Sequence, residues 1–248
     1  MTKYIAAYLS LLRDLHKNIQ LEPNSFEYIK NYYDSIIILD LTSIIVVDDA
    51  SDEFISHYAN RNVSFYKIQH ELDLDIMLNI KHLHDLRFVY FLELIIKDTT
   101  TDYFMLTDIS DVVIINPIQN IIDIDNNTIY VGKENQNISE NIWFNDTYSK
   151  LMNTSTFGDT KQVFRDKTLL NCGILFGHRD ILIDFLTTMT KLMIDIYQND
   201  VIDIVNKPID MFLVNYVGYK YFDIYDGSLL NTSFAQNEYD TTKCVKHK

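Results

Sequence analysis

The stretch from Tyr103 to Val113 reads Tyr-Phe-Met-Leu-Thr-Asp-Ile-Ser-Asp-Val-Val and joins an apolar run to two acidic residues, Asp108 and Asp111. The apolar run predicts a buried parallel strand that ends where the first carboxylate begins. Open α/β sheets bind ligands at the carboxyl ends of their strands, so we expect both acids at a binding site. Carboxylate oxygens are the ligands with which proteins hold Mg²⁺ or Mn²⁺ against a phosphate. The alternative is a solvated strand end without a ligand.

Acidic pairs also occur elsewhere in the chain. Two of them have the D-x-D spacing and lie in polar surroundings: Asp73 with Asp75, and Asp123 with Asp125. Polar surroundings favour a solvated turn for both pairs. Asp108 and Asp111 are three residues apart rather than two, which leaves open that only one of these carboxylates touches a metal directly.

Composition narrows the class of protein. The chain has 248 residues, of which 47% are hydrophobic, and a formal net charge of −14. Such a chain can bury one sizeable core, and its negative charge disfavours binding to nucleic acid. We expect no membrane span, because no apolar stretch reaches 18 residues. Cys172 and Cys244 are the only cysteines, which favours a reducing compartment, and the N-terminus lacks a signal-peptide pattern, so we expect a cytoplasmic location.

Strand-like and helix-like segments alternate along the chain. Strands are expected at residues 3–9, 43–47, 63–68, 103–107, 128–131, 169–177 and 220–224, and helices at 25–33, 52–60, 84–97, 180–197 and 210–217. A polar stretch covers residues 133–166, and no linker or repeat divides the chain. The alternation predicts a single α/β domain with a mainly parallel central sheet flanked by helices.

A second strand end carries a motif. Residues 45–52, Ile-Val-Val-Asp-Asp-Ala-Ser-Asp, resemble the V-V-D-D-x-S-x-D element of family 2 glycosyltransferases, where an Asp receives the nucleobase side of a nucleotide sugar. The whole chain more closely resembles a GT-A type group of metal-dependent glycosyltransferases seen in bacteria and large DNA viruses. The elements that carry this resemblance follow in order: residues 3–8, 85–88, 106–113, 171–177 and 210–216. It implies one GT-A (Rossmann-like) domain, with a nucleotide-binding half at about 1–117 and an acceptor and sugar half at about 118–248.

The resemblance also implies donor-binding residues. These are Tyr8, Asp48, Asp49, Asp85, Arg87, Asp108, Asn171 and Gly173. Arg87 would contact the donor phosphates or steady the acidic pair, for which a guanidinium fork is suited; the alternative is a surface salt bridge. Asn171 and Gly173 would line the donor-sugar pocket, with glycine permitting close approach of the backbone; the alternative is a strand bend without a ligand.

Catalytic and further metal-binding roles follow in the same way. Asp210 resembles the acid that contacts the transferred sugar, and it is a candidate general base if the enzyme inverts; the alternative is a helix N-cap. Glu134 is the second candidate. His247 resembles a third metal ligand beside Asp108 and Asp111, because neutral imidazole binds Mn²⁺ well.

The expected function is therefore metal-dependent glycosyl transfer. A hexosyl or deoxyhexosyl group would pass from a nucleotide sugar, with UDP favoured on family grounds, to a glycan or other acceptor, with Mn²⁺ or Mg²⁺ as cofactor. A viral member would act in the host cytoplasm. One alternative is a non-catalytic sugar-binding protein on a decayed GT-A fold. Another is a receiver-like signalling domain, which Asp48, Asp108 and the Lys207-Pro208 pair imitate, but the intervals between these residues are too long for it.

Overall fold

The structure is a computed structural model, and it describes residues 1–11, 13–14, 19–68, 80, 82–151, 164–198, 207–232 and 240–247. The acidic pair Asp73 and Asp75 lies outside these residues, as does part of the polar stretch at 133–166.

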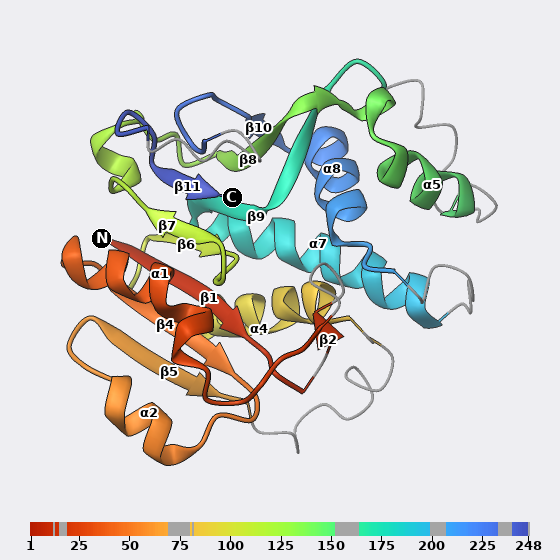
Figure 1. The fold of residues 1–248 in the computed structure, drawn as a ribbon. Coiled ribbons are helices and arrows are strands. Elements are labelled where there is room, and N and C mark those ends of the chain that lie inside the picture. Colours follow the sequence, from red (N-terminus) through yellow and green to blue (C-terminus); the bar gives the residue numbers. More distant parts are fainter. Residues whose placement is uncertain are drawn as a thin grey trace.

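A seven-stranded sheet forms the centre of the domain, in the order β10-β8-β9-β6-β1-β4-β5 (Figure 1). Its strands are β1 (Thr2–Tyr8), β4 (Thr42–Val47), β5 (Val63–Lys67), β6 (Tyr103–Thr107), β8 (Thr128–Asn137), β9 (Thr168–His178) and β10 (Asp223–Tyr225). Only β9 runs against its neighbours β6 and β8, and the other neighbouring pairs are parallel. The predicted fold class, α/β with a mainly parallel central sheet flanked by helices, is confirmed.

Helices and short strands surround this sheet. The helices are α1 (Phe26–Ile38), α2 (Asp52–Tyr58), α4 (Leu83–Lys97), α5 (Ile142–Leu151), α7 (Arg179–Gln198) and α8 (Asp210–Tyr221), with 3-10 turns η1 (Ile118–Asn120) and η2 (Ile138–Glu140). Two small sheets pair β2 (Arg13–Asp14) with β3 (Ile19–Gln20), and β7 (Val112–Ile114) with β11 (Val245–His247). Helices α4, α7 and α8 pack together, and α7 also contacts β6, β8 and β9, whereas α1 contacts β5 and β7 (Figure 1).

Strand β1 lies at the centre of the core. Tyr4, Ile5 and Ala6 are completely buried, as expected for a parallel strand covered on both faces. Because β1, β4 and β6 are parallel neighbours, their carboxyl ends meet at one edge of the sheet. Asp48 follows β4 and Asp108 follows β6, so the sheet brings both acidic strand ends to that edge.

The structure corrects several element boundaries. The last predicted strand at 220–224 begins too early, because α8 continues to Tyr221 and the Lys220 ammonium lies 4.7 Å from the Tyr216 ring centre one turn back. Strand β8 runs on to Asn137 and α5 lies in the stretch predicted to be polar loop. Among the described residues, no helix is both long and apolar enough to cross a membrane.

Candidate metal and substrate site

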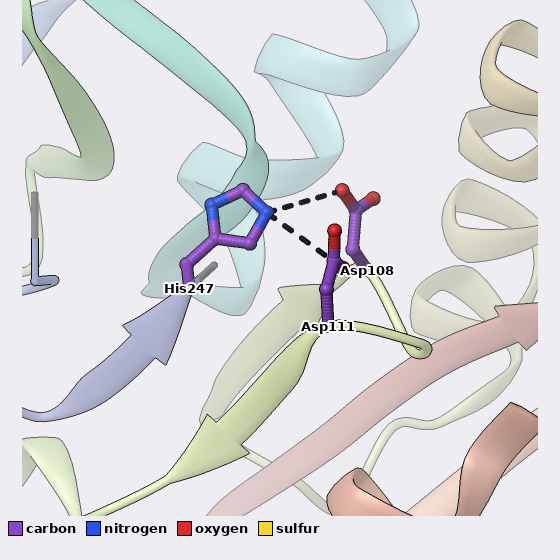
Figure 2. A group of neighbouring side chains, drawn as sticks. All are labelled: Asp108, Asp111 and His247. Carbon is purple, nitrogen blue, oxygen red and sulfur yellow. Dashed lines mark ion pairs between the residues drawn. The ribbon is translucent and has the colours of Figure 1, made fainter. Parts of the chain in front are cut away.

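Three predicted ligands converge beside the carboxyl end of β6. Asp108 follows β6, Asp111 precedes β7, and His247 lies on β11 (Figure 2). Antiparallel pairing of β11 with β7 sets His247 opposite Val112, next in sequence to Asp111. His247 Nε2 lies 3.4 Å from Asp108 Oδ2 and 3.9 Å from Asp111 Oδ1. The sheet and the C-terminal strand thus bring together residues that are 136 and 139 positions apart.

The spacing of this group fits a single divalent cation. One ligand atom from each residue lies within 4.8 Å of the others. A six-coordinate ion with bonds of about 2.0–2.1 Å places neighbouring ligand atoms about 3 Å apart. Two carboxylates and one imidazole are a donor set that suits Mn²⁺.

Gly173 closes one side of the group. A Cβ atom at this position would lie 2.6 Å from Asp108 Oδ2, 2.8 Å from His247 Cε1 and 2.9 Å from His247 Nε2. Its carbonyl oxygen accepts a hydrogen bond from the Asp108 amide, at 2.9 Å. Only glycine allows β9 to approach Asp108 and His247 so closely, because the side chain of a larger residue would fill the space next to them.

Arg87 links the metal group to Asp210. This arginine is on α4 and is 6% exposed, so its ion pair with the buried Asp210 is not at the surface, whereas the Asp108 side chain is 24% exposed. Its Nη1 contacts Asp108 Oδ1, and its Nη2 donates to Asp210 Oδ2 at 3.2 Å and to the Cys172 carbonyl at 3.3 Å. The guanidinium fork therefore holds two carboxylates at once.

Asp210 is the first residue of α8 and is 4% exposed. Burial alone would raise the pKa of Asp210, but Arg87 and His84, together with hydrogen bonds from the Cys172 thiol and the Met211 amide, hold that pKa below its ordinary value. The N-cap of α8 is Ile209, which offers no side-chain hydrogen bond, so the N-cap interpretation of Asp210 does not describe its position.

Asp85 is completely buried. Its carboxylate accepts hydrogen bonds from the amides of Ile209 and Asp210, at 3.0 and 2.8 Å, and from the Tyr197 hydroxyl. Burial and the nearby Asp210 charge raise the pKa of Asp85 to about 8 against the opposing effect of these donors. The side chain therefore faces α7 and α8.

Asn171 and Glu134 lie across the β8–β9 pair. Asn171 Oδ1 accepts from the Gly173 amide at 2.7 Å, and its Nδ2 contacts Glu134 Oε1. The register between β8 and β9 shifts on either side of Gly132 and Lys133, and Glu134 is half-buried there. An acidic side chain thereby reaches the strand that carries Gly173.

Tyr8, Asp48 and Asp49 lie at the ends of β1 and β4, farther along the same sheet edge. Asp48 is 6% exposed, and its oxygens accept from the Ser10 and Leu11 amides at 2.7 and 2.9 Å, so it holds the chain that follows β1. Asp49 is exposed. The Tyr8 ring stacks on Tyr28 with ring centres 5.2 Å apart.

Sequence reasoning missed three contributors to the site. The Cys172 thiol donates to Asp210 Oδ2 at 3.2 Å, and burial raises its pKa well above the usual range. Thr232 Oγ1 accepts from the His247 amide at 3.2 Å. Cys172 could have been found from its place between Asn171 and Gly173, whereas Tyr197 and Thr232 have no distinguishing local pattern. Asp123 and Asp125 are exposed, as predicted, but they lie in an irregular segment before the turn at residues 126–127.

No protein-family model and no curated protein sequence matches this chain. Solved structures do match it. The galactosyltransferase LgtC, in complex with donor and acceptor sugar analogs, matches 99% of this chain and 86% of its own at 16% identity and a TM-score of 0.60. Mouse xyloside xylosyltransferase 1 matches 100% and 98% at 10% identity and 0.54. The bifunctional enzyme WbbM matches 99% and 45% at 13% identity and 0.52. The chain has the GT-A fold of these glycosyltransferases, as its sequence predicted.

Proposed function

We propose that this protein is a metal-dependent glycosyltransferase that moves a sugar from a nucleotide-sugar donor to a carbohydrate acceptor. The observation that carries the proposal is the group of Asp108, Asp111 and His247, closed by Gly173, at the carboxyl ends of parallel strands. A GT-A fold without these ligands would support only the fold-level analogy. With these ligands, the chain could hold a cation, and a negatively charged protein needs that positive charge to bind a negatively charged diphosphate.

The donor would extend along the sheet edge. We assign its diphosphate to the ligand group and Arg87, its sugar to Asn171 and Gly173, and its nucleobase side to the ends of β1 and β4 with Tyr8, Asp48 and Asp49. Mn²⁺ or Mg²⁺ would be held by Asp108, Asp111 and His247. When bound, the ion supplies positive charge for the departing nucleoside diphosphate. The resemblance favours UDP as that nucleotide.

We assign contact with the transferred sugar to Asp210 and the role of general base to Glu134. The lowered pKa of Asp210 and its pairing with Arg87 keep it ionised, which suits contact with a sugar hydroxyl and weakens it as a base. Glu134 is half-buried at the neighbouring strand and contacts Asn171. If the enzyme inverts, we assign the proton of the acceptor hydroxyl to Glu134.

The test is a panel of nucleotide sugars assayed for hydrolysis and for transfer, with Mn²⁺, with Mg²⁺ and with EDTA. We expect turnover of one nucleotide class with Mn²⁺, together with thermal stabilisation by the matching nucleoside diphosphate. Asp108→Asn and Asp111→Asn should each lower turnover at least about a hundredfold, the size of effect seen when transition-state charge stabilisation is removed.

Matched controls separate the site from general effects of charge. Asp184 is an exposed acid of α7, and Asp184→Asn makes the same change in charge away from the site. We expect wild-type turnover for that variant. Stabilisation by a nucleotide without any turnover would instead identify a sugar-binding protein on a GT-A fold, and the absence of any nucleotide response would refute the proposal.

A further inference from the structure

The amino end of α8 is capped by a residue from another helix. Four amides at a helix start lack partners within the helix, and Ile209, the N-cap of α8, offers no side-chain acceptor. Asp85 of α4 supplies one instead, because its Oδ1 accepts from the amides of Ile209 and Asp210 at 3.0 and 2.8 Å. Ile209 and Asp210 are 124 and 125 positions after Asp85 in the sequence.

The second oxygen of the same carboxylate is held by α7. Tyr197 donates its hydroxyl hydrogen bond to Asp85 Oδ2. Asp85 is completely buried and Tyr197 is 5% exposed, so water does not compete for these bonds. Helices α4, α7 and α8 are therefore joined at one carboxyl group.

Asp210 is held from two directions as a result. Its backbone amide is bonded to Asp85, and its carboxylate lies 3.2 Å from Arg87 Nη2. Fixing the amide of the first helical residue fixes where its side chain leaves the helix. We propose that Asp85 and Tyr197 are positioning residues that keep the Asp210 carboxylate beside Arg87, an inference that rests on the glycosyl transfer proposed above.

The charges around Asp85 are consistent with a neutral acid in this role. In a protonated carboxyl group, Oδ1 can still accept both amides, and the Oδ2 hydroxyl then donates to the Tyr197 oxygen, which reverses the hydrogen bond that Tyr197 donates to the ionised carboxylate. Asp108 and Asp210 share one guanidinium, that of Arg87, and Asp85 lies next to Asp210, so a proton on Asp85 lessens the repulsion between these acids. Tyr197 on α7 and Asp210 on α8 act on Asp85 directly, and Cys172 on β9 also interacts with it. His84 and Arg87 on α4 act on the adjacent Asp210, and the ring of His82, the N-cap of α4, lies 6.5 Å from the Tyr197 ring.

The experiment compares Asp85→Ala, Asp85→Asn and Tyr197→Phe with the wild-type chain. Asp85→Ala removes the cap, so we expect kcat to fall at least about tenfold while the KM of the donor changes less than about threefold, since displacement of a positioned group affects the reaction step. The carboxamide oxygen of Asp85→Asn accepts the same two amides, so this variant should recover most of the loss. Tyr197→Phe should fall between them.

The dependence of activity on pH distinguishes a positioning role from a loss of packing, because a loss of packing alone would not change the pH at which activity declines. Because the folded pKa of Asp85 is raised to about 8, the wild-type protein should lose activity as pH rises through 8, and Asp85→Asn, which cannot ionise, should lack that decline. Equal kcat values for Asp85→Ala and Asp85→Asn would overturn the proposal, as would an unchanged alkaline decline in Asp85→Asn.

Urea unfolding decides the matter independently of turnover. Between about pH 4 and 8 the folded state would bind one more proton at Asp85 than the unfolded chain, so wild-type stability should fall with pH relative to Asp85→Asn. Asp85→Ala should be less stable than Asp85→Asn throughout. A wild-type protein that is inactive with every donor would refute the proposed function, whereas equal stabilities and parallel pH curves for these variants would refute the role of Asp85.

Discussion

At the scale of single residues, Asp108 divides its two carboxylate oxygens between different partners. Oδ1 contacts Arg87, and Oδ2 lies 3.4 Å from His247 Nε2. A carboxylate held at one oxygen keeps the other oxygen in place before any ion binds. The arginine thus orients a proposed metal ligand and also balances part of its charge.

Gly173 gives the sharpest test of this arrangement. An alanine Cβ would lie 2.6 Å from Asp108 Oδ2 and 2.9 Å from His247 Nε2, closer than nonbonded atoms pack. Gly173→Ala should therefore displace both ligands and weaken Mn²⁺ binding at least about tenfold, or about 1.4 kcal/mol. This affinity can be measured by titrating the protein with Mn²⁺ and monitoring the heat of binding or the electron paramagnetic resonance signal of the free ion.

Gly177 on the same strand is the matched control. An added Cβ there would meet the side chains of Ile181 and Leu182 at 3.3 Å, and side chains can shift by a few tenths of an ångström. Gly177→Ala should bind Mn²⁺ as the wild-type protein does. An unchanged affinity in Gly173→Ala would show that the ion is not held by Asp108 and His247.

At the scale of elements, the site depends on a strand of three residues. β11 pairs with β7 and sets His247 beside Asp111. Cys244 and Val245 are completely buried, and their amides donate to the carbonyls of Leu229 and Leu230, both at 3.0 Å. The C-terminal strand is therefore part of the core as well as the source of a proposed metal ligand, His247.

Removal of residues 244–248 and the single change His247→Ala should separate these two roles. The truncated chain loses the buried Val245 side chain, so its free energy of unfolding should fall by at least about 1.5–3 kcal/mol. His247→Ala keeps the strand and should lose Mn²⁺ binding with a smaller loss of stability. Urea unfolding in EDTA, with His57→Ala as a control at an exposed histidine of α2, measures both. Equal stabilities for the truncated and wild-type chains would contradict a structural role for β11.

Asp98 directly follows α4, and its carboxylate pairs with Lys3 near the start of β1. Burial alone would raise the pKa of Asp98, but the Lys3 ammonium and the donors of Thr100 and Thr101 outweigh it and hold that pKa well below its usual range. A depressed folded pKa stabilises the protein above the unfolded value of about 4, and this stabilisation is lost as pH falls.

Asp98→Asn should consequently be less stable than the wild-type chain at pH 7, and the difference should shrink below about pH 4. Urea unfolding from pH 7 to pH 2 gives the two curves, and Asp184→Asn should parallel the wild-type protein throughout. A difference between Asp98→Asn and wild type that stays constant down to pH 2 would show that ionised Asp98 is not what stabilises this corner.

At the scale of the whole molecule, local patterns predicted the strands that carry the site. The apolar run before Asp108 and the run before Asp48 became β6 and β4, because both runs are buried in the mainly parallel sheet, and an acid follows each strand. Helix α7 followed its apolar periodicity. Strand and helix periods are local properties, so one sequence is enough to find them.

Long-range partners could not be predicted in the same way. β11 has three residues, and its pairing with β7 is specified by contacts more than 130 positions away. The residue that caps α8 is Asp85 on α4, so the sequence next to Ile209 contains no capping residue that would predict it. His247 was placed in the site by resemblance, and the physical reason for its position, the β7–β11 register, became visible only in the fold.

The net charge of −14 gives the last prediction. At the ligand group, the charges of the Asp108, Asp111 and Asp210 carboxylates, the Arg87 guanidinium and a divalent ion would cancel, so the long-range field that a nucleotide sugar meets is the negative field of the rest of the protein. Raising NaCl from about 20 to about 200 mM shortens the screening length from about 20 to about 7 Å. With Mn²⁺ saturating, the KM of the anionic donor should therefore fall about two- to threefold, while the KM of an uncharged acceptor stays constant. A donor KM that rises with salt would instead reveal a locally positive donor site, with cations beyond Arg87 that the donor reaches when it binds.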